Sequence, residues 1–254
     1  MAAIIGTTSV MVVALGAEAL AKAAQGGRGF GGGRRPPLVE RDRVPYDGRF
    51  MFARLRYGTS MGRREPPWSH DYPRADWHFM RIVEEITLTR THREESNVFS
   101  LDDPELMNHP VSYMSEPGYW SMTDEEADGL RAYLLKGGFV IFDDFRGADW
   151  DHLEAQMSRV LPDLHFLPMD VTSPVFHSFF EIKTLEFQAY YDRDPSFWGL
   201  FEGNDPSKRL IAVANRNNDI GEYWEFSDTG YVPIDLSNEA YKFGVNYLVY
   251  AMTH

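Results

Sequence analysis

The chain has 254 residues, no cysteine, and 25 lysine and arginine residues against 38 aspartate and glutamate residues, a formal net charge of −13. Without a thiol there is no disulfide, cysteine nucleophile, thiolate metal site or attached c-type haem. The negative charge disfavours binding to nucleic acid or to an anionic membrane face. With 43% hydrophobic residues, the composition is that of a globular protein with one good core.

The N-terminal segment is typical of an exported protein. Residues 1–23 form a small-residue, apolar stretch that ends in Ala21-Lys22-Ala23, which fits the pattern read by signal peptidase. The hydrophobic block is too short for a membrane-spanning helix of about 20 residues. We therefore predict a cleaved signal peptide and a periplasmic or extracellular protein; the alternative is an N-terminal amphipathic or disordered tail on a cytosolic protein. Any membrane contact is expected through this segment alone.

A linker and one domain follow the predicted signal. Residues 24–47 are rich in Gly, Arg and Pro and are predicted to be a linker. Residues 48–254 are predicted to form a single domain in which strands and helices alternate. Hydrophobic periodicity and capping signals predict strands at residues 50–57, 110–114, 139–142 and 210–214, and helices at residues 74–89, 123–136, 148–161 and 236–252.

The strands indicate the fold class. Residues 139–142 and 210–214 are continuous apolar runs, as in strands of a parallel sheet that are buried on both faces. Alternation of such strands with helices predicts an α/β fold with an open, mostly parallel sheet and helices on both faces. Ligands of these folds bind beyond the carboxyl ends of the strands. This rule directs attention to Asp143 and Asp144.

Three segments resemble a known bacterial family, domain of unknown function 4159. They are residues 113–144, the Phe-His-Ser-Phe-Phe run at 176–180 and residues 246–254. The resemblance implies a flavodoxin-like sheet similar to that of class I glutamine amidotransferases, often in exported proteins, and it implies no established activity. In amidotransferases the turn after the strand equivalent to residues 139–142 presents a nucleophilic cysteine. Here Asp143, Asp144 and Phe145 follow that strand, which rules out amidotransferase catalysis.

The two aspartates are the first candidate site. A carboxylate at a strand end can bind a divalent cation, accept hydrogen bonds from a sugar hydroxyl or act as a general base. Side chains alternate along a strand, so we expect at most one of Asp143 and Asp144 to face a given pocket. The alternative is that one of them caps the helix that begins near Ala148.

Other candidate residues lie in three loops. His177 lies among aromatic residues, where burial favours the neutral imidazole of a metal ligand or general base, although a core histidine is the plainer interpretation. The loop after the first strand carries Trp68, His70 and Asp71, whose side chains suit the binding of a metal ion or a saccharide. The alternative is a plain surface loop. The segment after residues 210–214 carries amide and carboxylate side chains, which also suit a turn: Asn215, Asn217 and Asp219.

Two functional hypotheses follow. The first is a cell-envelope domain that binds a ligand or serves as a scaffold, with a small polar or glycan ligand, or envelope proteins, as partners. The second is a metal-assisted hydrolase of envelope glycans or small esters, in which Asp143 or Asp144 and His177 are ligands and His70 or Asp71 assists. No cofactor is predicted, and a divalent metal ion is the open alternative. The sequence is compatible with both a catalytic and a non-catalytic domain.

Overall fold

The computed structural model describes residues 43–59, 65–186, 191 and 193–254. In this part of the chain seven strands form one sheet in the order β2-β1-β3-β4-β7-β6-β5. Strands β2, β1, β3, β4 and β7 run parallel, and β6 runs antiparallel to both of its neighbours. The strands are β1 (Phe50–Arg56), β2 (Thr91–Ser100), β3 (Val111–Ser115), β4 (Phe139–Phe145), β5 (Phe166–Pro168), β6 (Ser196–Phe201) and β7 (Leu210–Arg216).

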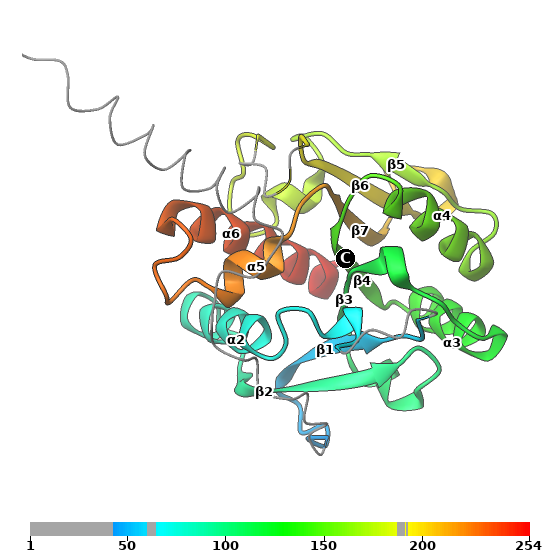
Figure 1. Cartoon of the computed structure of the whole chain (residues 1–254), viewed down its shortest axis with the longest axis horizontal. Helices are drawn as coiled ribbons and strands as arrows, with labels where there is room; N and C mark the ends of the chain where they lie inside the picture. The colour runs from blue at the N-terminus through cyan, green and yellow to red at the C-terminus, as the bar shows by residue number, and fades with distance from the viewer. Residues whose placement is uncertain (1–42, 60–64, 187–190, 192) are drawn as a thin grey trace, which may run out of the picture.

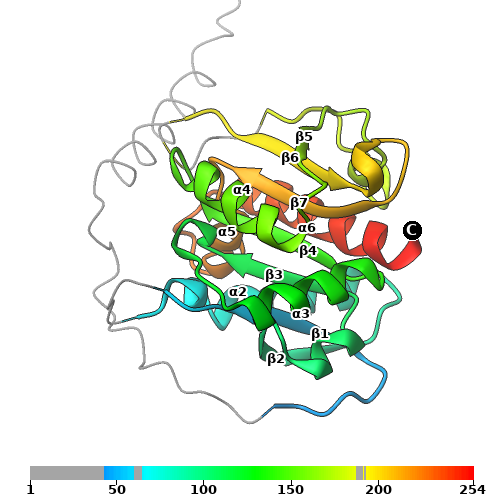
Figure 2. The same cartoon turned by 90° about the vertical axis from the view of Figure 1, so that its right-hand side faces the viewer.

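Helices cover both faces of the sheet. Figure 2 shows α3 and α4 on the near face and α2, α5 and α6 on the far face. Each face has its own apolar core, one built around α3 and α4 and the other around α2, α5 and α6. The helices are α2 (Arg74–Ile86), α3 (Asp124–Leu135), α4 (Asp149–Val160), α5 (Ile220–Glu225) and α6 (Ile234–Thr253).

This architecture confirms the predicted α/β class with an open, mostly parallel sheet. The order of the five parallel strands, β2-β1-β3-β4-β7, is the flavodoxin-like doubly wound order (Figure 1). The closer likeness to amidotransferases stays a prediction. The predicted strands and helices are found within a few residues of their expected bounds, including the capping box of α3, in which Thr123 and Glu126 bond reciprocally.

The sequence did not predict β2, β5, β6 or α5. Strand β2 lies at one edge of the sheet, and its central residues Arg93, Glu94 and Glu95 are exposed, so it lacks the apolar run of a central strand. Charged residues are common on edge strands because they hinder pairing with another chain. Helix α5 has six residues, too few to show a helical period.

The five parallel strands β2, β1, β3, β4 and β7 place their carboxyl ends along one edge of the sheet. The arrows of β3 and β7 end on the left in Figure 2, and the end of the chain lies on the right. Helix α2 follows β1 on one face and α3 follows β3 on the other, so the direction of winding changes between these two neighbouring strands. The left edge is therefore where this class of sheet binds ligands.

The predicted signal peptide and all but the last residues of the predicted linker lie outside the described residues. Within the described part, none of the helices combines the length and the apolar character that crossing a bilayer requires.

Candidate functional site: a histidine and carboxylate cluster

A backbone irregularity at the end of β4 sets the direction of its two aspartates. The pairing register of β4 with β7 shifts between Phe142 and Phe145, and Asp144 has a φ of 57°. A non-glycine residue in this left-handed region carries a strain of about 1–3 kcal/mol and is most often held at a functional site. Asp144 faces the β1–α2 loop, whereas Asp143 bonds to α5.

Four side chains converge at this edge, two from the β1–α2 loop, one from the end of β4 and one from the start of α5. One ligand atom each from His70, Asp71, Asp144 and Asp219 lies within 4.8 Å of all the others. Nδ1 of His70 is 2.9 Å from Oδ2 of Asp144 and 3.1 Å from Oδ1 of Asp71. The three aspartates are buried, whereas the His70 side chain is 31% exposed. The imidazole therefore forms the solvent side of the cluster.

A buried arginine fixes the loop that carries two of these residues. Arg54 of β1 is fully buried, and its guanidinium donates to both carboxylate oxygens of Asp76 at 2.5 and 3.3 Å. The same guanidinium donates to the backbone carbonyls of Trp68 at 3.1 Å and His70 at 2.8 Å. Because Arg54 bonds to both helix α2 and the preceding loop, it determines where His70 and Asp71 lie.

Asp219 joins the cluster from the start of α5. Its Oδ1 accepts a hydrogen bond from the backbone N–H of Glu222 and so caps the helix, while its Oδ2 is buried with no hydrogen-bond partner among the described residues. Burial is the largest of the effects that raise the pKa of Asp219 well above its ordinary value, and the negative charges of Asp144 and Asp71 raise it further. An unpartnered buried carboxylate oxygen is costly unless a ligand satisfies it.

Asp143 holds the neighbouring elements together. Its carboxylate accepts hydrogen bonds from the Tyr113 hydroxyl at 2.8 Å, the Asn215 amide at 3.0 Å and the backbone N–H of Gly221 at 2.9 Å. The Asn215 carbonyl oxygen in turn accepts from Tyr247 of α6. Burial raises the pKa of Asp143 to about 7, against the opposing effect of these three donors. With three donors on its carboxylate, Asp143 is a structural partner of the site.

The first turn of α5 lies directly against the cluster. A Cβ atom added to Gly221 would lie 2.5 Å from the Tyr113 hydroxyl and 2.7 Å from Oδ2 of Asp71. Only glycine fits at such a distance. The close approach brings the backbone of α5 and the carboxylates that follow it next to Asp71.

Two further hydroxyl groups contact Asp144. The Tyr191 hydroxyl donates to Oδ1, and the Ser115 hydroxyl lies 3.4 Å from Oδ2. Burial and then the charge of Asp144 raise the pKa of Tyr191, which keeps this hydroxyl protonated as a donor. The Arg146 guanidinium lies 4.4 Å from the centre of the Tyr191 ring. These contacts orient the Asp144 carboxylate toward His70.

His70 has an unusual electrostatic environment. Burial lowers the pKa of its imidazole, but the attraction of Asp71 and Asp144 outweighs this effect, and the pKa lies well above the ordinary value of 6.5. The raised pKa favours the imidazolium, whose positive charge offsets part of the charge of the two carboxylates.

The structure brings together some of the residues that the sequence predicted. His70, Asp71, Asp144 and Asp219 form the cluster, and Asp143 and Asn215 support it. Asn217 follows on the same segment, and within the described part of the chain its side chain bonds to the backbone, accepting from the N–H of Gly147 and donating to the carbonyl of Asp194. The predicted capping of the helix near Ala148 is wrong, because α4 has no side-chain cap.

Two predicted residues lie outside the cluster. His177 belongs to the short 3-10 helix η4 (Pro174–His177), is exposed, and places its ring nitrogens against the Val171 carbonyl and the Glu181 carboxylate. His177 is therefore not a buried core histidine, and it is not among the residues of the cluster. Trp68 is buried in the core on the α3 and α4 face, so it does not offer an open face for stacking on a sugar.

Sequence reasoning missed two acidic residues of α5. Glu222 and Glu225 are buried, and together with Asp71 they form a second group whose ligand atoms lie within 4.8 Å of one another. The spacing of Asp219 and Glu222 is a helix-start signal that reads D-x-x-E, and it would have placed both glutamates on one face of a helix. Arg54, Tyr113 and Tyr191 carried no such local signal.

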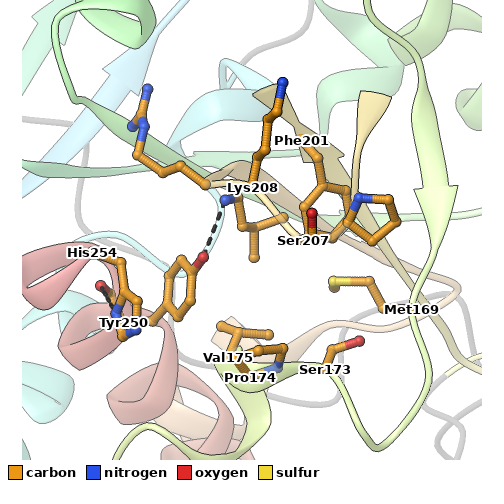
Figure 3. A pocket seen from close by; sticks show the side chains of 12 residues that line it. Met169, Ser173, Pro174, Val175, Phe201, Ser207, Lys208, Tyr250 and His254 are labelled. Atoms are coloured by element: carbon orange, nitrogen blue, oxygen red, sulfur yellow. Dashed lines mark hydrogen bonds between the residues drawn. The ribbon is translucent and has the colours of Figure 1, made fainter. Parts of the chain in front are cut away.

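The opposite edge of the sheet has a pocket of a different kind. A hollow of about 270 Å³ lies where β6 ends and β7 begins, next to the end of α6. Its walls include Met169, Val175 and Tyr250, whose hydroxyl accepts from the backbone N–H of Leu210 (Figure 3). Neither candidate metal group in the described residues includes a residue of this pocket. The pocket therefore lacks the ligand set found at the carboxyl edge.

Comparison with known proteins establishes the family. The model of the family described as domain of unknown function (DUF4159) matches residues 51–252, and the chain belongs to this family. No curated protein matches the chain.

Proposed function

We propose that this member of the domain of unknown function 4159 family binds a divalent metal ion at the carboxyl edge of its sheet and uses it in hydrolysis. The observation that carries the proposal is the convergence of His70, Asp71, Asp144 and Asp219, in which one buried oxygen of Asp219 has no hydrogen-bond partner among the described residues. A group of four ligand atoms of this extent suits one ion, because atoms on opposite sides of an ion lie about 4–5 Å apart.

The donor set indicates which ions fit. One imidazole nitrogen with three carboxylate oxygens suits Mn²⁺, Fe²⁺ or Zn²⁺ better than Ca²⁺, which takes only oxygen ligands. The exposed edge of His70 gives an ion and a substrate access from solvent. A bound divalent ion would activate water and polarise the oxygen of a scissile ester or acetal.

The surrounding residues have supporting roles. Tyr191 and Ser115 orient the Asp144 carboxylate, as hydrogen bonds to a metal ligand commonly do. Arg54 holds the His70 and Asp71 loop, and Asp143 holds the first turn of α5. A scaffold would not need these groups to converge, so the geometry favours the hydrolase hypothesis over the scaffold hypothesis. Small polar esters or glycans are the proposed substrates, and export to the cell envelope is proposed from the N-terminal sequence alone.

Metal binding is tested on the full chain after treatment with chelator. We expect excess Mn²⁺ or Zn²⁺ to raise the melting temperature by about 5–10 °C, the shift for a ligand at about 100 times its dissociation constant. Asp144→Asn should abolish the shift. His177→Ala is the matched control, because His177 is an exposed histidine outside the cluster, and it should keep the full shift. No shift with any divalent ion, or an undiminished shift in Asp144→Asn, would contradict the proposal.

Catalysis is tested separately with the metal-loaded protein. We expect hydrolysis of at least one chromogenic substrate among p-nitrophenyl acetate, p-nitrophenyl phosphate and a p-nitrophenyl glycoside. The activity should disappear with chelator and in Asp144→Asn, and should persist in His177→Ala. Metal binding without hydrolysis of any of them would overturn the hydrolase proposal in favour of ligand binding.

A further inference from the structure

We infer that Arg146 and Arg216 bind the anionic phosphoryl group of a phosphoester substrate beside the proposed metal ion. The inference rests on the proposed function and narrows its substrate class from small polar esters and glycans to phosphoesters. Both arginines lie at the carboxyl edge of the sheet, and each guanidinium lies over an aromatic ring. Among the described residues neither one has a carboxylate partner, in contrast to Arg54, which pairs with Asp76.

The backbone brings the two arginines next to each other. Phe145 of β4 is the register partner of Arg216 of β7, and the Phe145 carbonyl accepts from the backbone N–H of Asn217 at 2.9 Å. The backbone N–H of Gly147 donates to the Asn217 side chain at 3.3 Å. Arg146 therefore lies between two residues that are both tied to the segment that carries Arg216.

Tyr191 connects Arg146 to the metal cluster. The guanidinium carbon of Arg146 lies 4.4 Å from the centre of the Tyr191 ring, whose hydroxyl donates to Asp144. Burial and then the charge of Asp144 raise the pKa of this hydroxyl, whereas the charge of Arg146 lowers it. The Arg146 side chain is exposed, and Asp149 accepts from its backbone N–H. An anion that reaches Asp144 from solvent thus passes the Arg146 guanidinium.

Trp150 fixes the side chain of Arg216. The guanidinium carbon lies 5.0 Å from the centre of the Trp150 ring, which belongs to the first turn of α4. The Nε atom of Arg216 is buried with no hydrogen-bond partner among the described residues, whereas its two terminal nitrogens are not buried. The stem of the side chain is therefore packed, and the outer edge of the guanidinium faces solvent.

Stacked guanidinium groups suit a phosphoryl group. Stacking occupies the face of the guanidinium and leaves its N–H groups available for paired hydrogen bonds to phosphate oxygens. The cluster is acidic and the chain carries a net charge of −13, so an anionic substrate needs positive groups that no protein carboxylate neutralises. A phosphoryl group has several non-bridging oxygens, which can contact the ion and both arginines together. An acetate ester or a neutral glycoside offers no anionic oxygen.

Hydrolysis of a phosphate monoester needs no reactant besides water. The water oxygen bonds to phosphorus, the bond between phosphorus and the leaving oxygen breaks, and a proton from water passes to the leaving oxygen. The products are inorganic phosphate and an alcohol. Arg146 and Arg216 would stabilise the negative charge of the non-bridging oxygens during this step.

The test is the binding of phenylphosphonate, a phosphoester analogue that is not hydrolysed, to the full chain loaded with Mn²⁺. We expect isothermal titration calorimetry to show binding to the wild-type chain. Arg146→Met and Arg216→Met should each weaken it by about 10- to 100-fold, because each removes hydrogen bonds between charged groups. Their affinity for Mn²⁺ should not change. Arg90→Met is the matched control, because Arg90 is exposed and precedes β2 at the opposite edge of the sheet.

Kinetics give a second readout with a common leaving group. Both variants should raise the KM for p-nitrophenyl phosphate by a similar factor and leave the KM for p-nitrophenyl acetate unchanged. Equal changes for the two substrates would show a general disturbance of the site and would contradict the assignment of an anion subsite.

The outcomes separate this inference from the proposed function. Mn²⁺ binding without phenylphosphonate binding would overturn the anion subsite and leave the metal centre intact. Undiminished phenylphosphonate affinity in both variants would also overturn the subsite. Absence of Mn²⁺ binding would overturn the proposed function and this inference with it. Circular dichroism checks the fold of each variant, and Arg216→Lys replaces Arg216→Met if the latter does not fold.

Discussion

The two edges of the sheet differ in how their buried titratable groups are paired. At the carboxyl edge, Asp71, Asp144 and Asp219 lie within reach of one another with one imidazole between them. At the amino edge, the buried Tyr133 and the partly buried Arg209 have neutral or oppositely charged partners. Tyr133 donates to the carbonyl of His109, and Arg209 bonds to Glu202 and to the carbonyl of Leu134.

This difference separates the edge at which the cited polar groups are paired from the edge that we propose binds a metal ion. Burial lowers the pKa of His109 to about 4, against the opposing effect of the Asp103 charge, and this favours the neutral imidazole. Burial and like charges instead raise the pKa values of Asp143 and Asp219. The carboxyl edge therefore carries unfavourable electrostatic energy that a cation would relieve. The amino edge carries no comparable cluster among the described residues.

The largest expected difference between the edges comes from their arginines. Arg54→Met removes one partner of a fully buried ion pair and should lower the free energy of unfolding by about 3–5 kcal/mol. Arg209→Met at the amino edge removes a partly exposed pair with Glu202 and should cost about 1 kcal/mol. Urea denaturation of both variants measures the difference. Equal losses would show that the Arg54 pair is not specially important.

A double variant tests whether Arg54 positions the loop as well as stabilising the fold. Arg54→Met with Asp76→Leu removes both charges, so much of the stability should return. Because the loop would lose the arginine that bonds to the Trp68 and His70 carbonyls, the affinity for Mn²⁺ should stay low even where stability recovers. Recovery of full affinity would contradict the positioning role of Arg54.

At the cluster itself we expect a smaller change in the free energy of unfolding, and this change is a gain in stability. Asp219→Asn keeps an oxygen to accept from the Glu222 backbone and removes a charge that faces Asp71, Asp144 and Glu222. In chelator at pH 8 it should raise the free energy of unfolding by about 1–2 kcal/mol while it abolishes metal binding. A carboxyl group whose folded pKa is raised loses stability as pH rises, so the gain should shrink toward pH 4. Destabilisation at pH 8 would contradict the proposed charge excess.

The last prediction concerns the pH dependence of stability at His109. Its folded pKa of about 4 lies below its ordinary value of 6.5, so the stability that it contributes is fully present above pH 6.5 and is lost as pH falls toward 4. His109→Gln should remove about 1–2 kcal/mol of this acid-dependent loss. The urea midpoints of the wild-type chain and the variant at pH 7.5 and 4.5 measure this loss of stability. An unchanged difference between the two midpoints would contradict this role.

Some of the architecture could be predicted from local patterns. Continuous apolar runs identified β4 and β7, and the capping box identified the start of α3, because these signals depend on neighbouring residues alone. The charged edge strand β2 and the short helix α5 lacked such patterns. The rule for parallel sheets then directed attention to the correct end of β4, and Asp144 is indeed in the cluster.

The sequence by itself determined the composition of the chain, its alternation of strands and helices, and the loops that supply polar side chains. The tertiary structure decided which of these side chains meet. His70 and Asp219 are 149 positions apart in the sequence, and they converge only because β1, β4 and β7 end at the same edge. His177 carries the same chemical group as His70 but lies outside the cluster, because the segment that carries it packs against α6. Residue type is a local property, whereas convergence depends on strand order and on the direction in which each strand ends.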